Sequence, residues 1–177
     1  LIPRSVSIQS QEFTISSIGQ SSFKNNKNIK TIVLSNDSLI HSICKDAFSY
    51  SSIEKIIFSD KLTEIGESAF SWCQKLKTIE IPKNSSLCTI GKSAFAHSSI
   101  ESFSIPIQLT EINDFTFSYC ENMKSIQIPN NSQLHSIHKY AFSCSGIENI
   151  IISSKIVKLE EGWCAGTNKL VSFSISN

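Results

Sequence analysis

The feature that most constrains the fold is a repeat with two alternating lengths. A phenylalanine recurs along most of the chain, and the intervals between successive members alternate between 25 and 22 residues. A unit this short cannot bury its own apolar face, so neighbouring units must stack and cover one another. The sequence therefore predicts a solenoid of about seven units. Its core column is Phe23, Phe48, Phe70, Phe95, Phe117 and Phe142, with Cys164 at the next equivalent position.

Each unit ends in a segment that alternates apolar and polar residues, such as "LKTIEI" from Leu76 and "IESFSI" from Ile100. This alternation predicts one short strand per unit with one buried face. The segment before it, such as "ESAF", is expected to be short and helical or irregular. A glycine precedes several of these segments, and we expect positive φ there. The glycines are Gly19, Gly66 and Gly91.

Ten positions of one stretch form the pattern C-x-x-L-x-x-I-x-I-P, a short loop, and L-x-x-I-G-x-x-A-F. They are Cys73, Leu76, Ile79, Ile81, Pro82, Leu87, Ile90, Gly91, Ala94 and Phe95. This pattern resembles the treponema-type, or BspA-like, leucine-rich repeat family. The resemblance implies a leucine-rich-repeat solenoid of the β-rich α/β class, coiled in a curved right-handed path. We expect residues 1–177 to be a single domain truncated at both ends, because the pattern runs to both.

Composition and charge exclude several classes of function. Sixteen Lys and Arg against fifteen Asp and Glu leave a net charge of +1, so no overall field would gather nucleic acid or hold an acidic membrane surface. Every apolar run is far shorter than the roughly 20 residues that cross a bilayer. The amino end, "LIPRSVSIQS", lacks the hydrophobic run of a signal peptide. We expect no nucleic-acid partner and no membrane contact by this chain.

The six cysteines are expected to be free thiols. Cys73, Cys120 and Cys144 each stand three residues before a Leu-type residue, which indicates a column along the stack. Cys73 and Cys120 would lie two units, about 10 Å, apart, beyond the roughly 7 Å that a disulfide allows between Cα atoms. Cys120 and Cys144 lie in adjacent units, and a pair between them stays open.

No motif for catalysis, metal binding or a cofactor is evident. The chain lacks a nucleophile elbow, a phosphate-binding glycine loop and an H-E-x-x-H helix. His41, Cys88 and His135 share one repeat position, but their spacing scatters them too widely for zinc. His135 and His138, with Ser136, are expected to be solvated surface residues. The protein is therefore predicted to be no enzyme, with no metal and no cofactor.

The two strand positions that point away from the core form two columns along the solenoid. They are mostly small and nearly uncharged, which suits close approach by a protein or a glycan; nucleic-acid grooves carry basic residues interleaved with aromatics. Thr and Ser also tolerate strand pairing well, so a plain strand face explains the pattern equally. The candidate partner-binding residues are Thr31, Lys55, Thr78, Glu80, Ser102, Ser104, Ser125, Gln127 and Asn149.

An aromatic series follows the core phenylalanines at a distance of two residues. Its members are Tyr50, Trp72, His97 and Tyr119, in four consecutive units. Aromatic residues outside a core are often contact residues for a partner. The alternative is that they pack on one another between turns of the solenoid.

Three Asn-x-Ser sequons occur at Asn36, Asn84 and Asn130. Each falls in the longer loop of a 25-residue unit, so one edge of the solenoid would present all three. In a secreted eukaryotic protein they would be glycosylation sites. Asn and Ser are also common turn residues, which explains them without glycans.

The family resemblance implies a non-catalytic macromolecule-binding domain of a cell-surface or secreted protein, with adhesion to host proteins or cells as its role. Richness in Asn, Lys, Ser and Ile favours a protozoan parasite as the source. Two alternatives stay open. One is an intracellular, cytoplasmic protein–protein scaffold, where free cysteines are natural; the other is the recognition domain of a larger enzyme.

Overall fold

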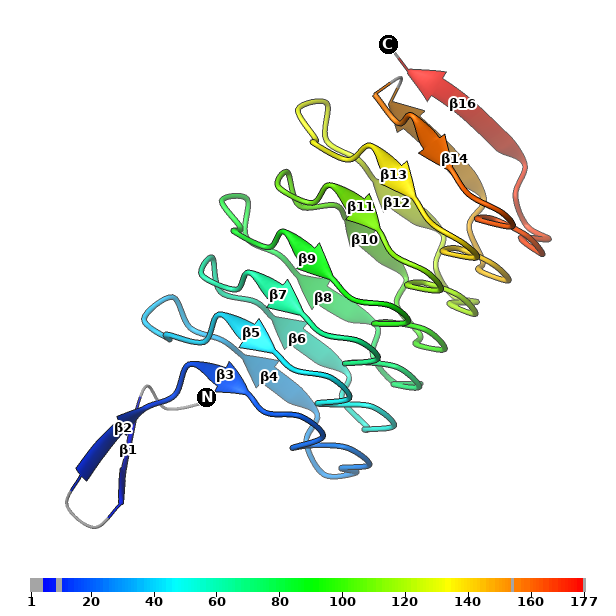
Figure 1. Cartoon of the computed structure of the whole chain (residues 1–177). Coiled ribbons are helices and arrows are strands. Elements are labelled where there is room, and N and C mark those ends of the chain that lie inside the picture. Colours follow the sequence, from blue (N-terminus) through cyan, green and yellow to red (C-terminus); the bar gives the residue numbers. More distant parts are fainter. Residues whose placement is uncertain (1–4, 9–10, 154, 177) are drawn as a thin grey trace.

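The computed structural model describes residues 5–8, 11–153 and 155–176. It is a solenoid in which each turn stacks on the one before, as Figure 1 shows from the blue amino-terminal end to the red carboxyl-terminal end. The predicted leucine-rich-repeat architecture is confirmed. Each turn contributes two strands, however, where the sequence predicted one.

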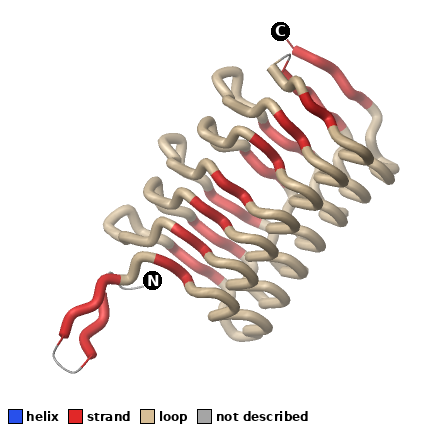
Figure 2. Tube along the Cα trace, in the orientation of Figure 1, coloured by secondary structure: helices blue, strands red, loops and turns tan. Residues whose placement is uncertain are grey.

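The strands form two parallel ladders on different sides of the turns (Figure 2). The longer strands are β4 (Thr31–Val33), β6 (Lys55–Ile57), β8 (Thr78–Glu80), β10 (Ser102–Ser104), β12 (Ser125–Gln127), β14 (Asn149–Ser153) and β16 (Ser172–Ser176). The short ones are β3 (Ser17–Ile18), β5 (Ser42–Ile43), β7 (Glu64–Ile65), β9 (Thr89–Ile90), β11 (Glu111–Ile112), β13 (Ser136–Ile137) and β15 (Lys158–Leu159). An antiparallel hairpin, β1 (Ser5–Ile8) and β2 (Gln11–Thr14), precedes the first turn and departs from the repeat.

The short strands escaped the sequence analysis because two residues carry too little periodicity. Each ends at the isoleucine or leucine five residues before the core position. The carbonyl of that residue accepts a hydrogen bond from the next turn: the Gly66 N–H donates to Ile43 O at 2.7 Å, and the Gly91 N–H donates to Ile65 O at 2.7 Å. The ladder therefore depends on backbone groups, which no sequence pattern marks.

Of the two alternatives predicted for the connections, helical or irregular, the structure shows the irregular one: the described residues contain no helix, and hence none that is long and apolar enough to cross a membrane. Between a short strand and the next long one, backbone N–H groups donate to the neighbouring turn. Examples are the Phe48 N–H to Ala69 O at 2.8 Å and the Tyr50 N–H to Ser71 O at 2.9 Å. In a helix, each of these N–H groups would bond to the carbonyl four residues back, so it could not bond to the neighbouring turn.

Positive φ also occurs at places the sequence did not predict. In each turn it falls two residues before and two residues after the core position, on residues such as Ser68 and Trp72. Gly66 and Gly91 are needed for close approach instead, because a Cβ would lie 2.7 Å from Lys45 N and 2.6 Å from Glu67 N, respectively. Only Gly162 and Gly166, among the described glycines, have positive φ.

The core is a column of parallel phenylalanine rings. Successive centroids lie 5.2 Å apart for Phe48 and Phe70, 5.4 Å for Phe70 and Phe95, and 5.6 Å for Phe95 and Phe117. These side chains are fully buried, which confirms the predicted register. Phe142 ends the column of rings, and the next turn places Trp163 edge-on to it at 6.4 Å.

Both ladders are interrupted near the middle of the solenoid. The long strands form one sheet of β4, β6 and β8 and a second of β10, β12, β14 and β16; the short strands divide between β9 and β11. At the second division the Ile90 carbonyl accepts its bond from the Asn113 side-chain amide at 2.9 Å. The two exposed columns predicted from the repeat therefore run over two separate sheets and not over one continuous sheet.

Candidate partner-binding surfaces

The strand face carries the predicted columns at its surface. Pairing aligns Thr31, Lys55 and Thr78 in the first sheet, and Ser102, Ser125 and Asn149 in the second. All nine predicted residues are exposed or half-buried, while the isoleucine or phenylalanine between each outward pair faces the core. Contacts between turns are polar: Lys55 Nζ lies 2.5 Å from Glu80 Oε1, and the Ser172 hydroxyl donates to Asn149 Oδ1 at 2.5 Å.

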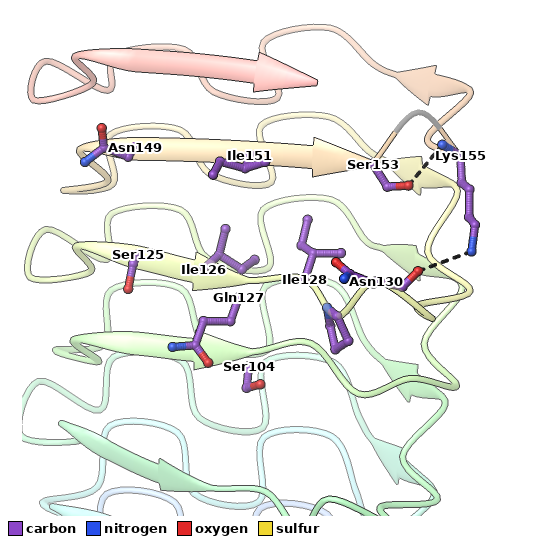
Figure 3. A pocket seen from close by; sticks show the side chains of 11 residues that line it. Ser104, Ser125, Ile126, Gln127, Ile128, Asn130, Asn149, Ile151, Ser153 and Lys155 are labelled. Atoms are coloured by element: carbon purple, nitrogen blue, oxygen red, sulfur yellow. Dashed lines mark hydrogen bonds between the residues drawn. The ribbon is translucent and has the colours of Figure 1, made fainter. Parts of the chain in front are cut away.

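The strand face opens into a hollow between β12 and β14 (Figure 3). These strands share the single pair Ser125–Asn149, whereas β10 and β12 share three pairs. The volume is about 730 Å³. Its lining residues are Ser104, Ser125, Ile126, Gln127, Ile128, Pro129, Asn130, Asn149, Ile151, Ser153 and Lys155. Four of them belong to the nine predicted partner-binding residues, and Asn130 was predicted only as a sequon. The rest were missed because strand spacing is invisible in a sequence.

Backbone groups line this hollow because a ladder bond is absent. In the preceding pair of strands, the Ile105 N–H donates to Gln127 O at 2.8 Å. The corresponding bond, from the Ile128 N–H to Ile151 O, is not formed in the described part of the chain. The Ile151 side chain is 60 % exposed beside the gap. The Lys155 ammonium, which donates to Asn130 O at 3.4 Å, provides the one positive charge of the lining.

The aromatic series forms a stacked column that is also exposed. Centroids lie 5.7 Å apart for Tyr50 and Trp72, 3.9 Å for Trp72 and His97, and 4.5 Å for His97 and Tyr119, with planes within 10° of parallel. Tyr50, Trp72 and Tyr119 remain 43 %, 37 % and 46 % exposed. Packing between turns, one of the two alternatives, is therefore confirmed, and the ring edges still reach the surface.

A groove of about 440 Å³ runs beside this column; we call it the aromatic groove. The stacked rings form one wall, and small buried residues form the floor. Those floor residues are Ser71, Ala96 and Ser118. The remaining lining residues are Lys24, Asp46, Ser68, Ser93 and Phe115. Lys24 and Asp46 lie 3.4 Å apart, so the two charges in this lining neutralise each other.

Burial lowers the pKa of His97 below its ordinary value of 6.5, against a smaller opposite effect of Glu121. The ring is therefore neutral at pH 7 and stacks as an uncharged aromatic. Contact with the Cys144 thiol raises the pKa of Tyr119. Cys144 thus continues the aromatic column with the same positive φ. Its predicted place in the column of buried cysteines is wrong: Ser145 occupies that place, because this turn is one residue shorter before its apolar residue Ile147.

Cys73 and Cys120 are buried, and all six cysteines are free. The Cys73 thiol donates to Phe48 O at 3.0 Å, and the Cys120 thiol donates to Phe95 O at 3.2 Å. Burial raises the pKa of Cys73 to about 11 and that of Cys120 to about 12. These thiols tie successive turns together as weak hydrogen-bond donors.

The sequons lie where the sequence placed them, in the long loops of residues 34–41, 81–88 and 128–135. Asn36, Asn84 and Asn130 are exposed. They are not fully equivalent: Asn84 stands one place later in its loop and donates to Asp60 Oδ2 at 3.1 Å. Hydroxyls of Ser38, Ser85 and Ser132 close the three loops by accepting the N–H two residues ahead. Glycosylation stays a prediction.

One cluster contradicts a sequence-based expectation. His138 is half-buried between two carboxylates, with Nε2 at 3.1 Å from Glu111 Oε2 and Nδ1 at 3.2 Å from Glu160 Oε2. The ligand atoms of Asp114, His138 and Glu160 lie within 4.8 Å of one another, a grouping with the chemistry of a metal site. Both acidic residues also form ion pairs with lysines: Lys92 Nζ lies 3.5 Å from Asp114 Oδ2, and Lys158 Nζ lies 2.5 Å from Glu160 Oε1.

The cluster had a signal in the sequence. His138 and Glu160 stand in the place that Gly66 and Gly91 occupy in earlier units, so consecutive turns align them. Lys158 is the main cause of a lowered pKa at Glu160, with His138 adding to it. The other suggested groupings remain apart from this cluster: His135 Nδ1 contacts Ser136 Oγ at 2.9 Å, and the exposed Cys88 thiol lies 3.5 Å from Thr63 O.

Comparison with known proteins identifies the repeat. A leucine-rich repeat protein from Bacteroides ovatus has a similar structure, with a TM-score of 0.71 and 22% sequence identity over 99% of this chain and 57% of that one. A leucine rich cell surface protein from Faecalibacterium prausnitzii gives a TM-score of 0.62 and 22% identity over 98% of this chain and 46% of that one. The chain thus spans about half the length of these two relatives.

No curated protein sequence matches the chain. The sequence model of the BspA type leucine rich repeat region, however, matches six copies over residues 4–87 and 88–177. Nearly the whole chain is covered by that match. The chain therefore belongs to the BspA-type leucine-rich repeat family.

Proposed function

We propose that this domain is a non-catalytic binding module of a cell-surface protein, which adheres to a protein or glycan through its strand face. The observation that carries the proposal is the hollow between β12 and β14, where small polar side chains, unpaired backbone groups and the exposed Ile151 lie together. Such a mixture provides both contact area and hydrogen bonds to a partner. The family and its surface-exposed relative support the location; a protozoan source rests on composition alone.

The test is a variant in which Thr78, Glu80, Ser102 and Ser125 are all replaced by Lys. Binding to immobilised host matrix proteins and mucin glycans would be measured by surface plasmon resonance. We expect the variant to lose binding while its circular dichroism spectrum is unchanged. A second variant, Ile151→Arg, fills the hollow itself and should weaken the same interaction.

A control variant places the same number of lysines elsewhere, with one unit less of added charge because Glu80→Lys also removes a negative charge. Gln20, Gln74, Gln108 and Asn122 are exposed and lie outside the strand columns, so their replacement by Lys should leave binding intact. Because the native face has little charge, affinity should also change little between low and physiological salt. Equal loss in both quadruple variants would mean that added charge, and not the strand face, is responsible.

A further inference from the structure

We propose that the aromatic groove is a second binding site, separate from the strand face, and that its ligand is an uncharged, proline-rich peptide in the polyproline II conformation. The groove crosses four turns, from Tyr50 to Tyr119. Its ligand class follows from which parts of the rings are free, from the repeat distance of the turns, and from the charge of the lining.

The faces of the central rings are already occupied. Trp72 lies between Tyr50 and His97, and His97 lies between Trp72 and Tyr119, all within 10° of parallel. Sugar rings bind flat against aromatic faces, and the two central rings of this column, Trp72 and His97, are stacked on both faces; Tyr50 and Tyr119, at its ends, are each stacked on one. The groove is therefore poorly suited to an oligosaccharide.

The edges of the rings are free and carry hydrogen-bond donors. Among the described residues, neither the Trp72 indole N–H nor the Tyr50 hydroxyl has a hydrogen-bond partner. Ring edges also carry the positive part of the aromatic quadrupole. Both features favour carbonyl oxygens in the ligand. A polyproline II segment exposes all of its carbonyls, because it forms no internal hydrogen bonds.

The spacing of the turns matches this conformation. One polyproline II turn of three residues advances about 9.3 Å, and two solenoid turns advance about 9.6 Å. Ligand carbonyls one ligand turn apart can therefore meet rings two solenoid turns apart, either Tyr50 and His97 or Trp72 and Tyr119. An extended β-strand repeats every two residues, about 6.7 Å, and does not stay in register with the rings. A strand would also need unpaired backbone groups in the wall, whereas the Tyr50 and Trp72 N–H groups already bond to the next turn.

The charge of the groove favours an uncharged ligand. Lys24 and Asp46 pair with each other at one end, and the rest of the lining consists of serines, an alanine and aromatic rings. The His97 ring is neutral at pH 7. A charged ligand side chain would lose hydration here without gaining a partner, whereas proline loses no charge and little conformational entropy on binding.

The experiment uses the fluorescence of Trp72, with Trp163→Phe as the background so that one indole reports. A capped, uncharged proline-rich peptide of about nine residues would be titrated into the protein; at about 3.1 Å per residue it extends past both ends of the aromatic column. We expect a saturable change in emission. Fluorescence anisotropy of the labelled peptide gives the same affinity without relying on Trp72 or on the Trp163→Phe background.

Variants locate the site. Trp72→Ala and Tyr119→Ala should each weaken peptide binding about tenfold or more, as expected for aromatic anchors of an interface. Phe173→Ala is the matched control, because Phe173 is as exposed as Tyr119, contacts Trp163 and lies outside the lining of the groove, and it should bind normally. The quadruple Lys variant of the strand face should also bind the peptide normally, which separates this site from the proposed adhesion surface.

Three results would overturn the proposal. The first is no saturable signal by either readout at millimolar peptide. The second is equal binding of a capped Gly-Ser peptide of the same length, which lacks the polyproline II preference. The third is a response to a β-linked oligosaccharide in place of the peptide, which would assign the groove to glycans.

Discussion

The third and fourth turns of the solenoid differ from the sixth and seventh in what holds neighbours together. At Gly66 and Gly91 the backbones approach so closely that a Cβ has no room. At the equivalent His138 and Glu160, side chains are in contact instead. The backbone bond is the same in both places: the Gly91 N–H donates to Ile65 O at 2.7 Å, and the Glu160 N–H donates to Ile137 O at 2.9 Å.

The core shows the same contrast. Phe70 and Phe95 are fully buried between two neighbouring turns, whereas the seventh turn is covered on one side only in this chain: Cys164 is half-buried, and Val171 and Phe173 are 81 % and 46 % exposed. Turns with the same backbone pattern therefore differ in how much of their apolar surface is covered. The difference arises from side-chain packing, and the following predictions test it in order of decreasing effect.

The largest contrast concerns thiol reactivity. With its pKa raised to about 12, Cys120 should be ionised at pH 8 on the order of a thousandfold less than a thiol of ordinary pKa. Alkylation of the native protein, followed by peptide mass spectrometry, should modify the exposed Cys88 first and Cys73 and Cys120 last. All six should react in urea. Labelling of Cys120 as fast as Cys88 in the folded protein would contradict the buried column.

Phe95→Ala should lower the free energy of unfolding by about 3–5 kcal/mol, because it leaves a cavity among buried rings. Phe95 contacts Phe70, Phe103 and Phe117 with ring centroids 5.4, 5.4 and 5.6 Å away. Cys164→Ala, at the equivalent position, should cost about 1 kcal/mol or less. Urea denaturation of both variants measures the contrast, and similar losses would mean that the seventh turn packs as tightly as the fourth.

Gly91→Ala should destabilise by about 1–3 kcal/mol, since its Cβ must displace backbone atoms of the preceding turn. The control is Gly19→Ala, where no atom lies within 4 Å of the added Cβ; there the restricted unfolded chain should give a gain of about 0.4–1 kcal/mol. Thermal denaturation distinguishes the two. A harmless Gly91→Ala would show that the turns can separate without cost.

The smallest effect belongs to Glu160, whose pKa is lowered from 4.5 in the folded state. A carboxylate with a depressed folded pKa stabilises the protein above its unfolded pKa, and this contribution disappears as the pH falls through the folded value. Glu160→Gln should therefore be less stable than the parent at pH 7 and should match it well below pH 4.5. Urea midpoints across that range provide the measurement, and a constant difference at every pH would exclude the ion pair as its cause.

The sequence predicted the parts of the fold that depend on apolar periodicity. The phenylalanine column, the long strands and the exposure of the aromatic series all follow from spacing within one unit. It failed where backbone bonds between turns decide the structure: the short strands and the positive φ at Trp72 carry no residue signature. For the connections it left helical and irregular structure open. Alignment on the wrong residue misplaced Cys144, which counting from Phe142 places correctly.

The candidate sites divide in the same way. The strand columns and the aromatic rings were identified as residues, but the hollow beside Ile151 and the groove beside Trp72 are properties of the distance between turns. The His138 cluster required the alignment of three units and the reach of a carboxylate from Glu111, which is on a different strand. Sequence reasoning could align His138 with Glu160 from their shared repeat position but had no means to predict the contact with Glu111.

The alternation of long and short loops has a consequence for how such a chain can change in length. Two successive units span 47 residues, as from Phe48 to Phe95, and removal or duplication of such a pair preserves the order of long and short loops. Loss of one 22-residue unit would instead place two long loops on adjacent turns, about 4.8 Å apart, an arrangement that does not occur in the described part of the chain. Gene rearrangements that preserve this alternation should therefore occur in steps of two units. Each step then adds or removes one long loop and one short loop together.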